Sequence, residues 1–324
     1  MSPRIAEAVA RLAAGEVVAF PTETVYGLGA DATNDAAIAK IFALKGRPVH
    51  HPLIVHIERP EDLDAWARNV PASARTLAER FWPGPLTMIL EKSPRLPASV
   101  TGGQASVGLR CPSHRIAQEL LREFARTASG VVAAPSANKF GHVSPTTAAH
   151  VREEFGSEIY VLDGGACEVG LESTIVDLSR GAPALLRPGA ISREELAEAL
   201  GEELRERDTE APRASGTLAS HYAPRTALLL ADAPTVDTLA RARPEAAVLA
   251  MRDAPEGVKV AAWIVAPCDP SAYGHDLYAN LRRLDASGAK RIVVEAPPAE
   301  SAWEAVNDRL TRAAAGAPPA GDEP

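Results

Sequence analysis

Short runs of strand-forming residues alternate with segments of helical periodicity along most of this chain. Between residues 5 and 200 the apolar runs include VVAF, LIVHI, LTMIL and SVGLR, and helical patterns separate several of them. A sheet built from such strands has apolar faces that helices must cover. The pattern therefore predicts the α/β fold class, with a first, many-stranded domain over residues 1–204.

A polar stretch without periodicity follows this domain. We interpret residues 205–225 as a linker. Beyond it, four more apolar runs and two helical patterns predict a second, smaller α/β domain at residues 226–316, of a three-layer, Rossmann-like type. The last residues, 317–324, read APPAGDEP, and we expect them to be disordered. A length of 324 residues suits this two-domain division.

Capping signals predict where individual helices begin. Asn34 precedes a helical pattern and can accept hydrogen bonds from its first N–H groups. Ser192 and Glu195 have the spacing of a capping box. Ser144, which is followed by a proline, predicts the start of a helix that ends near Phe155. This capping role is an alternative to a binding role for Ser144.

Composition limits the class of partner and the compartment. The net charge is -8, so the molecule as a whole does not suit a polyanion, although a local basic pocket remains possible. Its 3 cysteines are scattered without a C-x-x-C pair, which argues against a disulfide framework and a structural zinc site. Neither a signal-peptide pattern nor an apolar run of membrane length is present. We therefore expect a cytoplasmic protein without membrane contact.

The stretch FPTETVYGLGADA, which begins at Phe20, formally fits the G-x-G-x-x-A fingerprint of a dinucleotide site. Two features disfavour that interpretation. The first glycine of the fingerprint should follow the strand directly, but the segment PTETVY separates Gly27 from it. About 20 residues after Gly29, basic residues and histidines stand where the acidic ribose ligand is required. A G-K-S or G-K-T phosphate loop is absent as well. We expect the two glycines to turn the chain into the next helix.

Cationic residues with a glycine or a proline beside them follow several predicted elements. Lys45 and Arg47 flank a glycine after the second helix, a proline follows Arg47, and Arg187 ends a strand before a proline and a glycine. A cation at a helix C-terminus can simply stabilise the helix dipole, by about 0.3–1 kcal/mol, and this remains an alternative. The restricted backbone around Arg47 favours a binding role, because a solvated charge does not need such a frame.

Alternation along the run SVGLR separates its side chains between two faces. Val107 and Leu109 point one way, whereas Ser106, Gly108 and Arg110 point the other. If the core takes the first pair, a hydroxyl and a guanidinium project together on either side of a glycine. We therefore expect a binding role for Ser106 and Arg110.

Three histidines lie close together in the sequence. His50 and His51 are adjacent in a loop, and His56 lies in the strand LIVHI. Zinc is disfavoured because Cys, Asp and Glu are absent among them. For His56, a satisfied structural role is the alternative to a ligand role.

Hydroxyl groups follow several predicted strands. Thr24 lies in TET, Ser136 in PSAN and Ser173 in EST. A serine hydrolase is disfavoured, because the chain has no G-x-S-x-G elbow. Hydrogen bonding to a phosphate or a carboxylate fits these loops better. Together with the cations, they suit a polyanion and an amino-acid-sized partner, with catalysis by positioning and charge neutralisation. Mg²⁺ carried in with nucleotide phosphates would not need a protein cage.

A series of motifs resembles one known family. PTETVYGLGADA, KGRPVHHPLIVHI, WPGPLT, SVGLRCPSH, APSAN with SPT, GLESTIVDL and LLRPG look like the successive motifs of the L-threonylcarbamoyladenylate synthases of YrdC-like fold. SHYAP, followed by a second α/β domain, resembles the longer two-domain branch of that family. The resemblance implies a twisted mixed sheet in the first domain.

The resemblance also implies a reaction. L-Threonine, bicarbonate and ATP would give threonylcarbamoyl-AMP and pyrophosphate, for modification of the tRNA adenosine beside the anticodon. The product would pass to a tRNA threonylcarbamoyl transferase complex, and tRNA itself is a possible partner.

Site residues follow from the same resemblance, position by position. Threonine would be held by Thr24, His56, Arg110, Ala134 and Ser173. The nucleotide would be held by Lys45, Arg47, His51, Ser106, Ser136, Ser144, Arg187 and Tyr222, with Lys45 and Arg47 as the catalytic pair and Tyr222 in a lid. A protein-bound metal site is not implied. The family usually has a small polar residue where this chain has His51.

Two other hypotheses remain at this point. One is an RNA-binding module that uses a basic concave surface, which the acidic net charge weakens. The other is carbamoyl transfer to another acceptor on the same fold.

Overall fold

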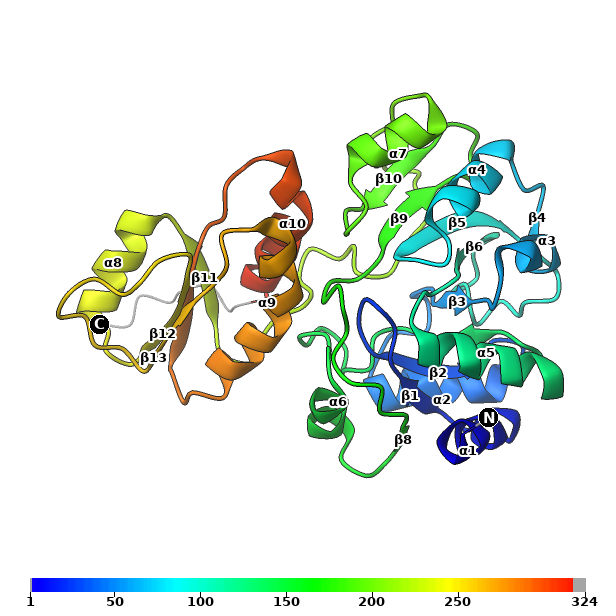
Figure 1. The fold of residues 1–324 in the computed structure, drawn as a ribbon, viewed down its shortest axis with the longest axis horizontal. Coiled ribbons are helices and arrows are strands. Elements are labelled where there is room, and N and C mark those ends of the chain that lie inside the picture. The colour runs from blue at the N-terminus through cyan, green and yellow to red at the C-terminus, as the bar shows by residue number, and fades with distance from the viewer. Residues whose placement is uncertain (1, 317–324) are drawn as a thin grey trace. The chain divides into compact units, whose positions relative to one another are not determined.

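The computed structural model describes residues 2–316, which divide into two compact units (Figure 1). The first unit runs to Phe140 and resumes from Pro145 to Thr217. The second comprises Gly141–Ser144 and the described residues from Leu218 onward. The change of unit after Thr217 falls inside the predicted linker, so residues 205–217 belong to the first unit. The predicted disordered segment 317–324 lies outside the described residues.

A mixed sheet forms the centre of the first unit. Within residues 2–316 it has 10 strands in the order β10-β9-β5-β6-β3-β7-β2-β1-β8, and β4 pairs with β5. Parallel and antiparallel pairs both occur, which confirms the predicted α/β class. The strands are β1 (Val18–Phe20), β2 (Gly27–Asp31), β3 (Ile54–His56), β4 (Ala67–Arg68), β5 (Leu86–Lys92), β6 (Ser106–Arg110), β7 (Val132–Ala133), β8 (Tyr160–Val161), β9 (Thr174–Asp177) and β10 (Ala184–Arg187).

Helices cover the two faces of this sheet unequally. Val107 and Leu109 of β6 lie in the main core, to which α2, α4, α6 and α7 also contribute. A separate core joins α1 and α5 to β1 and β7 on the other face. Further along that face, Ile89 and Ile175 pack against Ala214 of the predicted linker. The helices are α1 (Pro3–Ala13), α2 (Asp35–Lys45), α3 (Leu63–Trp66), α4 (Ala72–Phe81), α5 (Arg115–Thr127), α6 (Ala148–Phe155) and α7 (Arg193–Leu200), with the 3-10 turn η1 (Pro60–Asp62).

The prediction that Gly27 and Gly29 turn the chain into a helix is wrong. Both lie in strand β2, which pairs antiparallel with β1, and the TETVY segment connects the two strands. A Cβ on Gly29 would lie 2.7 Å from Phe20 Cε1 and from Val132 Cγ1, so close packing requires glycine there. Because these glycines lie inside a strand, they do not form a dinucleotide loop at a helix N-terminus.

Two of the predicted helix caps are confirmed and one is wrong. The Asn34 side chain accepts hydrogen bonds at the start of α2, and Ser192 with Glu195 forms the capping box of α7. Helix α6 begins later than predicted, because Thr147 and not Ser144 caps it. The structural role that the sequence suggested for Ser144 is therefore absent.

The second unit has a smaller sheet, which is entirely parallel. In the described part of the chain its 4 strands have the order β11-β14-β12-β13. Helix α8 lies on one side of it, and α9 and α10 lie on the other (Figure 1). This agrees with the predicted three-layer type. The elements are β11 (Leu228–Ala231), α8 (Ala233–Ala242), β12 (Ala246–Ala250), β13 (Ala262–Val265), α9 (Pro270–Asp285), β14 (Arg291–Glu295), η2 (Ser301–Trp303) and α10 (Glu304–Ala314).

Hydropathy and helix length together argue against a membrane-spanning helix. Among residues 2–316, no helix combines the length and the apolar character that a bilayer crossing requires.

Candidate functional site

Strands β3 and β6 place polar side chains next to each other on the sheet face opposite the main core. The two strands are parallel, and His56 is the register partner of Arg110. Ser106 and Arg110 lie on this face because Val107 and Leu109 take the core positions, which confirms the predicted alternation. A Cβ on the residue between them, Gly108, would lie 3.2 Å from the nearest side-chain carbons, so the backbone is closely covered there.

Arg110 forms a buried ion pair that the sequence reasoning missed. Its Nη2 donates to Glu23 Oε1 at 2.7 Å, and the two side chains are only 5% and 3% exposed. The other Glu23 oxygen accepts the Ser113 N–H at 3.1 Å. Within residues 2–316, Arg110 Nε is buried and has no hydrogen-bond partner. Glu23 lies inside the TET segment, but nothing in the sequence separated it from a surface carboxylate.

His56 stays neutral in this environment. Burial, followed by the nearby positive charge of Arg110, lowers the pKa of His56 to about 3. Its Nδ1 is buried without a hydrogen-bond partner in the described part of the chain. Among the described residues, His56 and Arg110 therefore each have one buried polar atom without a partner, and they lie on adjacent strands. A purely structural histidine would have its polar atoms satisfied, so this arrangement favours a site for a small polar ligand.

Buried hydroxyl groups occur at two of the predicted positions. Thr24 Oγ1 lies 2.9 Å from Thr22 Oγ1, which in turn donates to a backbone carbonyl. Ser173 Oγ lies 2.7 Å from Thr87 Oγ1. Both predicted residues are almost fully buried, so their hydroxyl groups are fixed in position.

Lys45 holds the loop that contains Ser136. Its Nζ donates to the Ser136 carbonyl at 2.6 Å and also to the Asn138 carbonyl. The lysine is 3% exposed, and burial together with the charge of Arg47 lowers its pKa well below the usual range. Its burial and its hydrogen bonds to this loop show that Lys45 does not serve only as a helix C-terminal charge.

Arg47 and His51 lie around Phe140. Arg47 Nη2 donates to the Pro52 carbonyl at 3.0 Å, and the guanidinium carbon is 5.7 Å from the centre of the Phe140 ring. The His51 ring packs edge-on against the same phenyl ring at 5.4 Å. Burial and the Arg47 charge lower the pKa of His51 to about 4, so this histidine is neutral at physiological pH.

Arg187 ties two segments of the first unit together. Its Nε and Nη2 donate to the Ser173 carbonyl at 3.0 and 2.8 Å, and Nη2 also lies 3.1 Å from Ser173 Oγ. Its Nη1 donates to the Ser215 carbonyl at 2.9 Å. Arg187 thus contacts both a predicted threonine-binding residue and the predicted linker.

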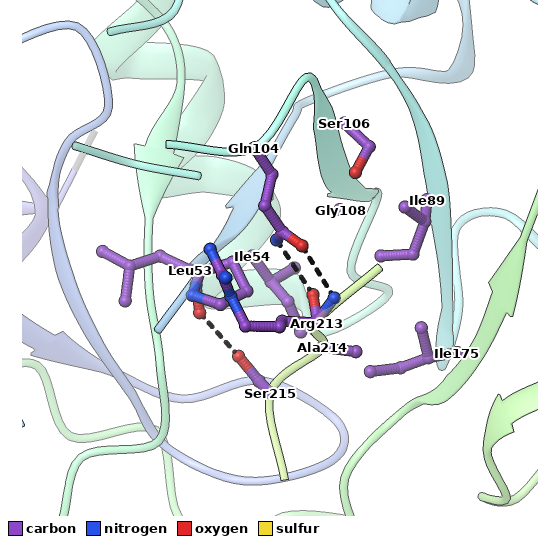
Figure 2. A pocket seen from close by; sticks show the side chains of 11 residues that line it. Leu53, Ile54, Ile89, Gln104, Ser106, Gly108, Ile175, Arg213, Ala214 and Ser215 are labelled. Carbon is purple, nitrogen blue, oxygen red and sulfur yellow. Dashed lines mark hydrogen bonds between the residues drawn. The ribbon is translucent and has the colours of Figure 1, made fainter. Parts of the chain in front are cut away.

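Residues 213–215, which we call the strap, cover this face of the sheet (Figure 2). Gln104 clamps the strap through two hydrogen bonds with the Arg213 backbone, at 2.7 and 3.1 Å. Ser215 Oγ donates to the Pro52 carbonyl at 2.9 Å and accepts from Arg47 Nη2 at 3.3 Å. The cavity left under the strap, beside Ser106, measures about 10 Å³. That is space for about one water molecule. No local pattern predicts these contacts, because the segment lacks periodicity.

Three other predicted site residues have different environments. The Ala134 N–H donates to the Ile54 carbonyl at 2.9 Å, so it is used within the sheet. Ser144 and Tyr222 both belong to the second unit and are buried there. Tyr222 has a φ of 61°, and its ring lies 5.8 Å from the Tyr278 ring and 5.2 Å from the guanidinium carbon of Arg309.

Metal ligands do not converge in the described residues. No group of three His, Cys, Asp or Glu side chains between residues 2 and 316 is arranged to hold a metal ion. The histidine cluster noted in the sequence contains only a stacked pair, His50 and His51, with ring centres 4.6 Å apart.

Both units match family models. Residues 10–189 match the Sua5/YciO/YrdC model, described as "Telomere recombination". Residues 191–315 match the model described as "Threonylcarbamoyl-AMP synthase, C-terminal domain". The two matches together cover most of the chain.

Individual relatives are similar over nearly their whole length. A threonylcarbamoyl-AMP synthase of Pyrococcus abyssi is 37% identical, with 96% of this chain and 95% of that protein aligned. One from Schizosaccharomyces pombe is 33% identical over 92% of this chain and 84% of that protein. A crystal structure of Pyrococcus abyssi Sua5 complexed with L-threonine has a TM-score of 0.87 and 35% identity, covering 96% of this chain and 94% of that one.

Proposed function

This chain belongs to the Sua5-type threonylcarbamoyl-AMP synthases, and we propose that its first unit holds L-threonine and ATP on the sheet face covered by the strap. The resemblance found in the sequence is confirmed. The chain is a nucleotidyltransferase that makes threonylcarbamoyl-AMP in the biosynthesis of the tRNA modification t6A. The RNA-binding and carbamoyl-transfer hypotheses are therefore set aside as its main function.

The proposed reaction uses three substrates. The ammonium group of threonine loses a proton to water, the resulting amine forms a bond to the carbon of bicarbonate, and water leaves. An oxygen of the resulting carbamate attacks the α-phosphorus of ATP, and the bond to the β-phosphate breaks with release of pyrophosphate. The enzyme does not need a nucleophile of its own, because the carbamate supplies the attacking oxygen. Its residues would act by positioning the substrates and stabilising charge.

We propose that threonine occupies the space beside Arg110 and His56. The unused Arg110 Nε is a donor suited to an α-carboxylate, and His56 Nδ1 is a buried, uncharged polar atom. Thr24 and Ser173 would supply hydroxyl groups, and Ala134 would contribute its backbone. The Ala134 contact would involve the carbonyl, because its N–H already bonds to Ile54.

We propose that the phosphates of ATP are held by the cations beside this subsite. Lys45 and Arg47 would stabilise the charge that develops on the leaving pyrophosphate, and Arg187 would contribute a further guanidinium. The remaining nucleotide contacts that the resemblance implies, Ser106, Ser136, His51, Ser144 and Tyr222, stay predictions. Mg²⁺ would arrive as part of the ATP substrate, coordinated mainly by phosphate and water.

The contacts of the strap support our proposal that the linker acts as a lid. The Ser215 hydroxyl accepts a hydrogen bond from Arg47, and the Ser215 carbonyl accepts one from Arg187. A cavity of about 10 Å³ cannot accept a nucleotide beneath residues 213–215. ATP would therefore have to displace the strap, which could then close over the bound substrates. A cytoplasmic location and transfer of the product to a tRNA threonylcarbamoyl transferase complex also remain predictions.

The observation that carries this site assignment is the gathering of Lys45, Arg47, His56, Arg110 and Arg187 in one unit, all buried. The test is pyrophosphate release from ATP, measured with threonine or bicarbonate omitted in turn. We expect each omission to abolish release. Release that ignores either omission would contradict the proposed reaction.

A further inference from the structure

We propose that Glu23 is a positioning residue of the threonine subsite, which fixes the guanidinium of Arg110 for the substrate carboxylate. This inference rests on the proposed role of Arg110 in binding threonine. It adds a residue to the site that neither the motifs nor the charge pattern of the sequence indicated.

Glu23 is itself held rigidly. One carboxylate oxygen accepts from Arg110 Nη2 at 2.7 Å, and the other accepts the Ser113 N–H at 3.1 Å. The backbone carbonyl of Glu23 accepts the Val169 N–H at 2.7 Å. With both oxygens and the backbone engaged, the carboxylate has little freedom to move, and it fixes the end of the Arg110 side chain.

The pairing leaves a specific part of Arg110 unused. A guanidinium has five N–H donors in a rigid plane, and Glu23 takes one of those on Nη2. The Nε group is buried without a partner among residues 2–316, and an unpaired buried donor costs free energy. Such a donor is expected where a ligand completes the hydrogen bonding. His56, the register partner of Arg110, has a second buried polar atom in the same condition.

Glu23 could instead compete with the substrate for Arg110, and the two roles predict opposite results. A competitor would weaken threonine binding, so its removal would lower the KM for threonine. A positioning residue already holds the arginine side chain in place, so less conformational entropy is lost when the substrate binds. Removal of the positioning residue would therefore raise that KM. Burial favours positioning, because a fixed pair with side chains only 5% and 3% exposed cannot exchange readily with solvent.

The test is the substitution Glu23→Gln. Glutamine has one carbonyl oxygen, so it cannot accept from both Arg110 and the Ser113 N–H as Glu23 does. Without this carboxylate, threonine would have to order the Arg110 side chain on binding, so the KM for threonine should rise about two- to tenfold, with a much smaller change in the KM for ATP. Glu7→Gln is the matched control, since Glu7 pairs with Arg11 at the same distance of 2.7 Å but at the surface. We expect this control to behave as the wild type.

A second ligand separates positioning of Arg110 from a general structural role. L-Threoninamide lacks the carboxylate that Arg110 would bind. If Glu23 acts through Arg110, Glu23→Gln should weaken binding of threonine but leave binding of threoninamide nearly unchanged, as measured by calorimetry. Equal loss for both ligands, or a threonine KM that stays constant or falls, would overturn the proposal. Normal threonine binding by Arg110→Gln would instead refute the assignment of Arg110 itself.

Discussion

Removal of the Gln104 side chain should make the enzyme bind ATP more tightly. Gln104 clamps the strap through two hydrogen bonds to the Arg213 backbone, at 2.7 and 3.1 Å. Each contributes about 0.5–1.5 kcal/mol net, and their partial exposure favours the lower half of that range. Gln104→Ala should therefore destabilise the covered conformation by about 1–2 kcal/mol in total.

The effect on ATP follows from the population of the covered state. In the proposed site, Ser215 accepts hydrogen bonds from Arg47 and Arg187, so the covered state would not accept the phosphates. The apparent Kd is the intrinsic Kd divided by the fraction of molecules that can bind. If the covered state dominates, a loss of about 1–2 kcal/mol lowers the apparent Kd by about 5- to 30-fold.

The assay is calorimetric titration of a non-hydrolysable ATP analogue into wild type, Gln104→Ala and Gln104→Glu. The glutamate variant keeps the acceptor for the Arg213 N–H and loses the donor to its carbonyl, so an intermediate Kd is expected. An unchanged or higher Kd in Gln104→Ala would refute the reasoning, because the contacts of Gln104 with the strap would then not oppose ATP binding.

Further predictions concern the cations, the packing and the pH response. Arg47→Ala and Arg110→Ala should each lower kcat/KM about a hundredfold or more while keeping a cooperative thermal transition, and near-wild-type turnover of either would refute the role of that residue. Gly29→Ala should lower the free energy of unfolding by about 1–3 kcal/mol in denaturant titrations, because its Cβ would lie 2.7 Å from two core side chains. The neutral state of His56, whose pKa is lowered from 6.5 to about 3, should stabilise the fold fully above pH 6.5 and progressively less as the pH falls towards 3. His56→Asn should flatten the measured stability in that interval.

The sequence was most informative where side chains alternate between two environments. In SVGLR, the apolar Val107 and Leu109 require the core, and this alone directs Ser106 and Arg110 to the other face. Alternation is uninformative for GLGAD, because glycine has no side chain that distinguishes the two faces of a strand. The close packing of these glycines against Phe20 is a tertiary effect. Local polarity did not reveal Glu23 either, since its role depends on a partner 87 positions away in the chain.

The predicted linker shows a further limit of local patterns. Residues 205–217 lack a periodic apolar pattern. The strap within this segment is held by hydrogen bonds to specific groups, so it does not need a regular apolar face. Gln104 and Arg213 are separated by 109 positions, so nothing in either segment predicts their contact. A capping signal was misleading for a related reason. Ser144 has the right neighbours for a cap, but Thr147 three residues later takes that position.

The two proposed subsites differ in their electrostatics, which would allow one site to bind both substrates. The charge of Arg110 is balanced by Glu23, which suits a threonine zwitterion without net charge. Around Arg47, burial and then the positive charge of that guanidinium lower the pKa of both Lys45 and His51. The negative charge of a polyphosphate would offset the charge of Arg47 and favour a proton on Lys45.

Proton uptake on ATP binding tests this argument. The phosphates should raise the lowered pKa of Lys45, so binding at a pH above the pKa of the empty site should take up a proton. Calorimetry of the same ATP analogue in buffers of different ionisation enthalpy measures this uptake directly. In Lys45→Arg the cation stays protonated, and the contribution of this residue should disappear. Equal uptake in wild type and variant would show that Lys45 does not change its protonation when ATP binds, and its lowered pKa would then not contribute to ATP binding.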